Sequence, residues 1–104
     1  MSLYPVKVLF EQLADASEPL QAGVTVSSRK FRKAVERNRV KRILREAYRL
    51  QKLPLSDTLK EKDINLALFF IYTGKELPVF AEVYEKMGIL LQKLQDEILK
   101  PPRH

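Results

Sequence analysis

The segment from Arg29 to Lys52 carries eleven lysines and arginines against two acids. Ammonium and guanidinium groups bind phosphate, and arginine adds a planar, bidentate geometry that lysine cannot supply. So dense a run of like charge destabilises a folded chain unless an outside partner neutralises it. The segment sums to +9 while the whole chain of 104 residues sums to +6, so the excess is local. We interpret the segment as a binding surface for a polyanion.

Three polyanions fit this charge: RNA, DNA and an anionic membrane surface. The competing interpretation is a solvated helix face with ion pairs such as Arg42–Glu46, but two acids cannot offset eleven cations. Helical DNA readers usually come as helix-turn-helix units or zipper dimers. Here the basic segment lies between predicted strands and no leucine heptad follows it, which mildly favours RNA.

The chain has few residues that could carry catalysis. It contains no cysteine, and its single histidine is the last residue, His104. Glu61 and Asp63 are close in sequence, but Lys60 and Lys62 beside them are typical of a solvated loop. We therefore predict that the chain alone is not catalytic and holds no metal. Its longest apolar run is too short to cross a bilayer and no secretory signal is evident, so we expect a cytoplasmic protein.

Three strands are predicted. Tyr4–Ala14 is rich in β-branched and aromatic residues with partial alternation, and Val24–Ser28 is typical of a second strand. Asp15–Gly23 between them has the composition of a turn, so an antiparallel hairpin is expected. Asp63–Gly74 is nearly all apolar, which is typical of a strand buried on both faces.

Two helices are predicted. The basic segment has one apolar stripe at helical spacing, made by Val40, Ile43, Leu44 and Ala47. This helix should end near Lys52, because Pro54 disfavours continuation and Leu53–Asp57 has a loop composition. A closing helix with Pro78 in its first turn carries a longer stripe, in which Gly88 should cost about 1 kcal/mol relative to alanine. This second stripe consists of Phe80, Val83, Met87, Leu90, Leu91, Leu94 and Ile98.

The predicted fold class is α+β, in the order strand, strand, helix, strand, helix, with the helices packed on one face of a small sheet. The hydrophobic fraction of 45% is typical of a globular protein and excludes a chain that is disordered as a whole. At this length it predicts a single domain over residues 1–104, in which Pro101–His104 form a short C-terminal tail. Phe31 should anchor the turn before the basic helix, and Phe69, Phe70 and Tyr72 should lie in the core. Tyr48 could equally contact RNA or close the edge of the core.

The residues from Val26 to Leu50 resemble the signature segment of the protein subunit of bacterial ribonuclease P. In that family a strand ending in serine leads through a basic crossover to Ala-Val-x-Arg-Asn-Arg-hydrophobic-Lys-Arg, with a further arginine three residues on. The matching residues here are Ala34, Val35, Arg37, Asn38, Arg39, Val40, Lys41, Arg42 and Arg45. The order of the later elements is also similar, so the resemblance extends from about Tyr4 to Leu99.

The resemblance implies a fold similar to ribosomal protein S5 domain 2, with a left-handed βαβ crossover that breaks the usual right-handed preference. It also implies a role in a ribonucleoprotein endoribonuclease that removes the 5′ leader from precursor tRNA. In that family the RNA subunit performs the hydrolysis with Mg²⁺, while the protein helps to hold the catalytic RNA and the leader. Its partners are therefore expected to be ribonuclease P RNA and precursor tRNA. A general RNA-binding or ribosome-associated module of the same fold is the alternative.

Charge and the motif match together predict the residues that face RNA. Asn38 could read a base edge or a sugar hydroxyl through its amide. The predicted RNA-binding residues are Ser27, Ser28, Arg29, Lys30, Arg32, Lys33, Arg37, Asn38, Arg39, Lys41, Arg42, Arg45 and Arg49.

The chain departs from the family before Tyr4. Members usually begin with a helix and a short strand there, and neither is evident, so we expect a shortened N-terminus. The missing helix normally contributes aromatics to the leader cleft, and its loss should expose apolar surface that invites self-association. The candidate leader contacts are Tyr4, Val6, Val8 and Phe10, although their alternation is more typical of core packing.

Overall fold

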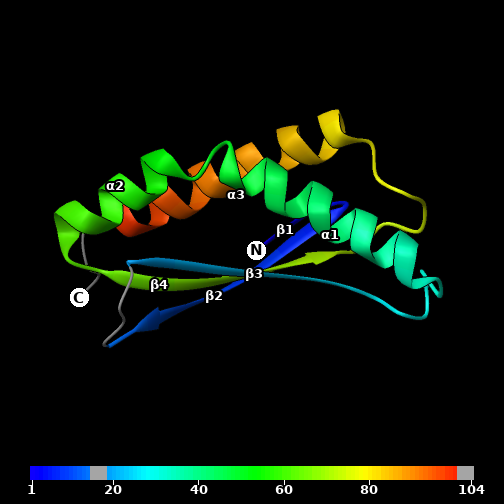
Figure 1. The fold of residues 1–104 in the computed structure, drawn as a ribbon. Coiled ribbons are helices and arrows are strands. Elements are labelled where there is room, and N and C mark those ends of the chain that lie inside the picture. Colours follow the sequence, from blue (N-terminus) through cyan, green and yellow to red (C-terminus); the bar gives the residue numbers. More distant parts are fainter. Residues whose placement is uncertain (15–18, 101–104) are drawn as a thin grey trace.

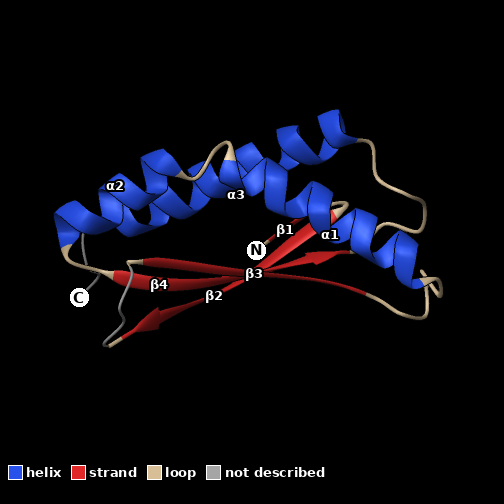
Figure 2. Cartoon of the chain, in the orientation of Figure 1, coloured by secondary structure: helices blue, strands red, loops and turns tan. Residues whose placement is uncertain are grey.

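The computed structural model describes residues 1–14 and 19–100. It contains seven elements, which form one sheet and one layer of helices (Figure 1). The strands are β1 (Ser2–Leu3), β2 (Val6–Leu13), β3 (Leu20–Val26) and β4 (Asn65–Tyr72). The helices are α1 (Ala34–Arg49), α2 (Leu53–Lys62) and α3 (Phe80–Leu99). The predicted α+β class is therefore confirmed, with helices on one face of the sheet (Figure 2).

The predicted hairpin between the first two long strands is wrong. The sheet order is β1-β2-β4-β3, so β4 lies between β2 and β3. β4 pairs antiparallel with β2, from Val6 opposite Tyr72 to Leu13 opposite Asn65, and parallel with β3. The most apolar strand thus takes the central position, where both of its edges are paired. The turn predicted between β2 and β3 includes residues 15–18, which lie outside the described residues, as does the predicted tail at 101–104.

β4 is buried on one face rather than on both. Leu66, Leu68, Phe70 and Tyr72 point to the helices and are buried, whereas Phe69, on the opposite face, is 44% exposed. The apolar run predicted double burial because Ala67, Phe69 and Ile71 are apolar too, but none of the helices in the described part of the chain covers their side of the sheet (Figure 1). Phe69 instead lies across Gly23 on β3, where a Cβ would be 3.0 Å from the ring, so only glycine fits without displacement.

Two elements differ from the pattern predicted along the chain. The two-residue strand β1 pairs with β2, where the sequence predicted no strand before Tyr4. The segment predicted as loop is the helix α2, because Pro54 ends α1 and then occupies the first turn of a new helix, where proline is well tolerated. Leu55 and Leu59 anchor α2 in the core. Pro78, in contrast, precedes α3, which begins two residues later after the extended residue Val79.

The helices close the core through their apolar stripes. Val83, Met87, Leu90, Leu91 and Leu94 of α3 are buried as predicted, while Phe80 and Ile98 at its ends are more exposed. At Gly88, α3 meets the end of α1: the Gln51 amide donates hydrogen bonds to Ala47 O at 3.1 Å and to Tyr84 O at 2.9 Å. A Cβ at this glycine would come too close to Gln51 Oε1, so a larger residue there would have to displace the Gln51 side chain that makes these two hydrogen bonds. Within residues 1–14 and 19–100, no helix is both long and apolar enough to cross a membrane.

Candidate nucleic-acid interface

The buried stripe of α1 fixes the direction of its charged face. Val40, Leu44 and Ala47 are completely buried and Ile43 is partly buried, as predicted. Because these residues follow helical spacing, the positions on the opposite side of α1 point to solvent. The predicted residues that are exposed along α1 are Asn38, Arg39, Arg42, Arg45 and Arg49, and Lys41 is half-buried.

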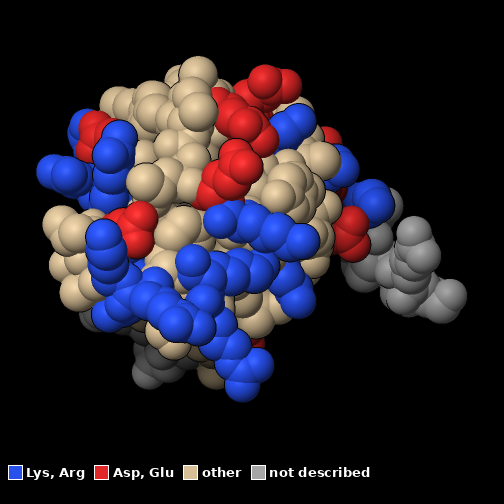
Figure 3. All heavy atoms as spheres, turned by 90° about the vertical axis from the view of Figure 1, so that its right-hand side faces the viewer, with Lys and Arg blue, Asp and Glu red and all other residues tan. Residues whose placement is uncertain are grey.

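The positive charge forms a continuous surface at the end of the molecule where α1 begins. Figure 3 shows lysine and arginine atoms gathered in a broad band, with most aspartate and glutamate atoms lying above it. The band has few internal partners: within the described residues, no hydrogen bond or ion pair engages the side chains of Arg39, Arg42 or Arg45. The same is true of Arg29, Arg32, Lys33, Asn38 and Lys41. A row of unneutralised cations remains available to an external anion.

Arg49 differs from the rest of this row. Its guanidinium pairs with Glu46 through both carboxylate oxygens, with Nε 3.2 Å from Oε2. The hydrogen bond from Arg49 lowers the pKa of Glu46, and the same bond raises the pKa of Arg49. Both side chains stay charged at neutral pH, so their charges cancel locally. Arg49 is thus the member of the predicted set with the least free charge for an RNA phosphate.

Arg37 has an internal role that the sequence did not predict. Its Nη1 donates to the carbonyl oxygens of Phe31 at 2.9 Å and Arg32 at 2.7 Å. The residue before the helix, Lys33, makes no side-chain cap, so Arg37 is what ties the start of α1 to the preceding segment. We predicted that Arg37 faces RNA; the structure assigns part of its donor capacity to the backbone instead.

The segment before α1 is held at several points. Phe31 is buried as predicted and lies 6.0 Å from the Tyr72 ring, and its N–H donates to Ser27 O at 3.1 Å. Lys30 Nζ donates to Thr73 O at 2.9 Å, which joins this segment to the end of β4. These contacts bring the segment beside the first turns of α1, together with the predicted residues Ser27, Ser28, Arg29, Lys30, Arg32 and Lys33.

Replacing Arg37 separates this internal role from binding. Arg37→Ala should lower the free energy of unfolding by about 1–2 kcal/mol, because two carbonyl oxygens lose a charged donor. Arg39→Ala, two residues on, should leave it within about 0.5 kcal/mol, because that side chain is exposed and has no partner. Urea denaturation of the two variants measures both values. Equal stability for the two would contradict the role assigned to Arg37.

The candidate leader contacts do not form one surface. Val6 and Val8 are completely buried under the helices, so the prediction that they contact a leader is wrong and the core interpretation is confirmed. Tyr4 is 64% exposed and Phe10 47% exposed. Tyr4 lies before β2 begins at Val6, and the four residue steps from Val6 to Phe10 alone span about 13 Å, so the two aromatics cannot stack on adjacent bases. Tyr4 lies at the turn into β2, and Phe10 lines a hollow beside Leu94 and Ile98 of α3.

Tyr48 closes the edge of the core. Its ring lies 5.5 Å from that of Phe70, and it is half-buried. Lys52 Nζ lies 5.9 Å above the same ring. Lys52 was not among the predicted RNA-binding residues, although it is the last cation of the basic segment.

Carboxylates do not gather into a site. Glu61 is an exposed residue of α2 and Asp63 is the C-cap of that helix, in the left-handed conformation with φ of 56°. Among the residues that the structure describes, no three acidic or histidine side chains are grouped so that they could hold a metal ion.

The fold and this surface define a class: a small α+β domain whose connection between two parallel strands carries an unneutralised cationic helix.

The sequence profile of the family Ribonuclease P matches residues 4–95. A curated "Ribonuclease P protein component" of Porphyromonas gingivalis is 43% identical over 89 residues, covering 82% of this chain and 63% of the relative. A protein of the same name from Acinetobacter baylyi is 38% identical over 92 residues, covering 85% of this chain and 63% of the relative. No solved structure matches the chain.

The chain belongs to the family of ribonuclease P protein components. It spans 63% of the length of these curated relatives.

Proposed function

We propose that the chain is the protein subunit of a ribonuclease P and binds the catalytic RNA through the exposed cations of α1. The observation that carries this proposal is the row of Arg39, Arg42 and Arg45, which is exposed and has no partner among the described residues. Successive arginines on one helix face can follow a phosphate backbone, and each phosphate they neutralise releases counterions and adds to affinity. The family match and the names of the relatives support ribonuclease P RNA as this partner.

In the proposed assembly the RNA subunit removes the 5′ leader of precursor tRNA, and Mg²⁺ belongs to that RNA. The chain contributes positive charge, which lowers the concentration of other cations needed to bring the RNA surfaces together. Its described residues offer no internal histidine or cysteine and no metal-binding cluster, which supports a binding role. We place this work in the cytoplasm, where tRNA precursors are made.

The test is reconstitution with a bacterial ribonuclease P RNA. At low Mg²⁺, where the RNA alone is poorly active, adding the chain should restore cleavage of precursor tRNA at the leader junction. A ribosomal RNA fragment of equal length is the control for specificity. If the chain neither binds ribonuclease P RNA nor restores cleavage, the proposal fails, and equal affinity for both RNAs would favour the general RNA-binding module instead.

We also propose that the uncovered face of the sheet permits self-association. Leu9 and Phe69 are cross-strand neighbours on that face and are 48% and 44% exposed. Burying them between two copies would remove apolar surface from water. Sedimentation at several concentrations should show a larger species as concentration rises, and Leu9→Glu should return it to a monomer. A concentration-independent monomer would contradict this.

A further inference from the structure

We propose that the RNA-binding surface continues past α1 into a groove along the free edge of β3 and holds an unpaired RNA segment there. The proposal rests on the proposed function, since the same RNA would occupy both surfaces. It adds Lys52 and Lys60 to the residues that contact RNA.

The groove consists of two adjoining hollows of about 560 and 160 Å³. They share Leu20, Tyr48 and Lys52, so one runs into the other at the corner between α1 and α2. One wall is the edge of the sheet, formed by Pro19, Leu20, Gln21, Ala22 and Val24. The other wall comes from the helices and their junction and is formed by Arg45, Tyr48, Lys52, Ser56 and Lys60.

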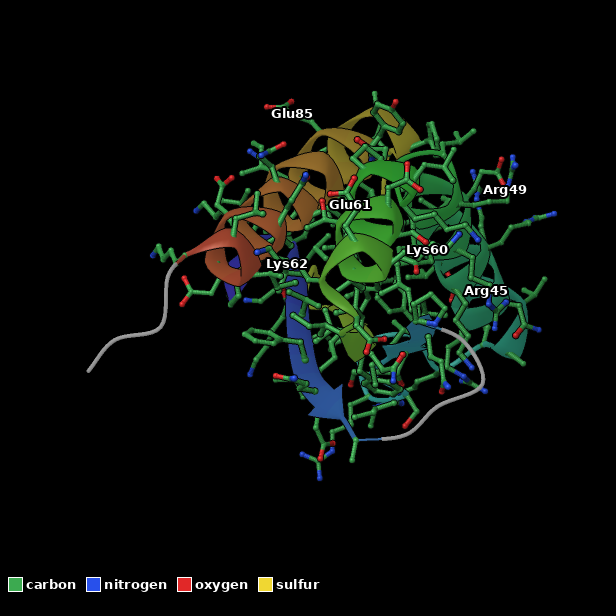
Figure 4. The ribbon with its side chains drawn as sticks, turned by 90° about the vertical axis from the view of Figure 1, so that its left-hand side faces the viewer. Arg45, Arg49, Lys60, Glu61, Lys62 and Glu85 are labelled. Atoms are coloured by element: carbon green, nitrogen blue, oxygen red, sulfur yellow. The ribbon has the colours of Figure 1, made fainter. Side chains whose placement is uncertain are left out.

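The helical wall is positive and carries no acid. Arg45, Lys52 and Lys60 are its charged residues, and among the residues that the structure describes no aspartate or glutamate lines either hollow. The acids of α2, Asp57 and Glu61, lie four residues apart and so occupy a different row of that helix. In Figure 4, Lys60 lies on the side of α2 that faces α1 and Arg45, whereas Lys62 lies on the opposite side. The groove therefore continues the positive surface of α1 toward α2.

The sheet wall supplies hydrogen-bonding groups. Within residues 1–14 and 19–100, β3 is the edge strand of the sheet and pairs only with β4, so its outer backbone groups have no strand partner there. Backbone N–H groups are donors to phosphate and sugar oxygens in nucleic-acid complexes. Ala22 and Val24 add a shallow apolar floor beside them.

An unpaired RNA strand fits this arrangement better than a duplex does. The cations stand along one wall only and the donors along the other, so a single backbone lying between them can meet both. Single-stranded sites in proteins typically combine such a positive groove with apolar or aromatic surface against the bases. A duplex would bring a wide convex surface, and its bases would stay paired and out of reach of the floor.

A pair of charge-matched variants tests the groove. Lys52→Gln with Lys60→Gln should lower the salt slope of binding to ribonuclease P RNA by about 1.4, at about 0.7 per lost phosphate contact to a single strand. The control, Lys62→Gln with Lys93→Gln, removes the same charge at positions that line neither hollow and should leave the slope within error. Equal slopes for the two double variants would overturn the proposal. Loss of binding with Arg39→Ala and Arg42→Ala tests the proposed function separately, so either can fail without the other.

Nuclear magnetic resonance locates the contact. Hexauridylate added to the ¹⁵N-labelled chain should shift the amide signals of residues 21–25 and of Lys60, and the shifts should fade in the Lys52→Gln, Lys60→Gln variant. Shifts confined to other parts of the chain would overturn the proposal. So would equal or stronger shifts from a hexaglutamate peptide with no response to the RNA, which would assign the groove to an acidic protein partner.

Discussion

Replacing Arg39 and Arg42 together by alanine should weaken binding to ribonuclease P RNA and lower its salt slope by about 1.8, at about 0.9 per phosphate contact to a duplex. Both side chains are exposed and neither has a partner among the described residues, so nothing inside the protein depends on their charge. The free energy of unfolding should therefore stay within about 0.5 kcal/mol of the parent value. Filter binding from 50 to 400 mM salt and urea denaturation measure the two quantities.

The control for this pair removes equal charge from α3. Lys86→Ala with Lys93→Ala lowers the net charge by the same amount on a different helix, so it reports the effect of overall charge alone. If the α1 and α3 variants lose affinity and slope equally, the chain attracts RNA only by its total charge. If the α1 variant unfolds while its salt slope is unaltered, the two arginines are structural.

Phe70→Ala should have the largest effect on stability. Phe70 is completely buried at the centre of β4 and its ring lies against Tyr48 of α1. Removing a buried phenylalanine ring typically costs about 3–5 kcal/mol, through lost burial and the cavity that remains. A domain of this size has a total stability of about 5–15 kcal/mol, so the variant should be close to unfolding at 37 °C. Because the ring supports α1, RNA binding should fall with the folded fraction.

The neighbouring residue provides a matched control. Phe69 has the same side chain and the same strand, but it lies on the uncovered face and is 44% exposed. Phe69→Ala should cost less than half as much as Phe70→Ala, measured by thermal denaturation. Equal losses would mean that both faces of the sheet are covered, contrary to the fold described above.

Local pattern predicted the helical elements better than the sheet. The stripe of Val40, Leu44 and Ala47 depends only on spacing within one helix, and it is buried as predicted. Strand pairing depends on contacts between residues far apart in sequence, and the expected hairpin of neighbouring strands was wrong for this reason. The left hand of the crossover stays a prediction. α2 could have been found, because proline in the first turn, Leu55 and Leu59 four residues apart and lysines in the last turn are helix signals.

The candidate site was predicted in outline but not in the roles of its members. Charge and the motif match indicated Arg39, Arg42 and Arg45, which are exposed on α1. They could not distinguish Arg37, which hydrogen-bonds to the backbone of the preceding segment, or Arg49, which pairs with Glu46. Lys60 was missed because it belongs to another helix and reaches the groove only through the tertiary fold.

The most direct test of the central claim is protection of individual arginines from phenylglyoxal, read by mass spectrometry with and without ribonuclease P RNA. Arg39, Arg42 and Arg45 should react readily in the free chain and become strongly protected when the RNA is bound. Arg49, held by Glu46, should change much less. Reactivity of the three arginines that is the same with and without saturating RNA would contradict the account.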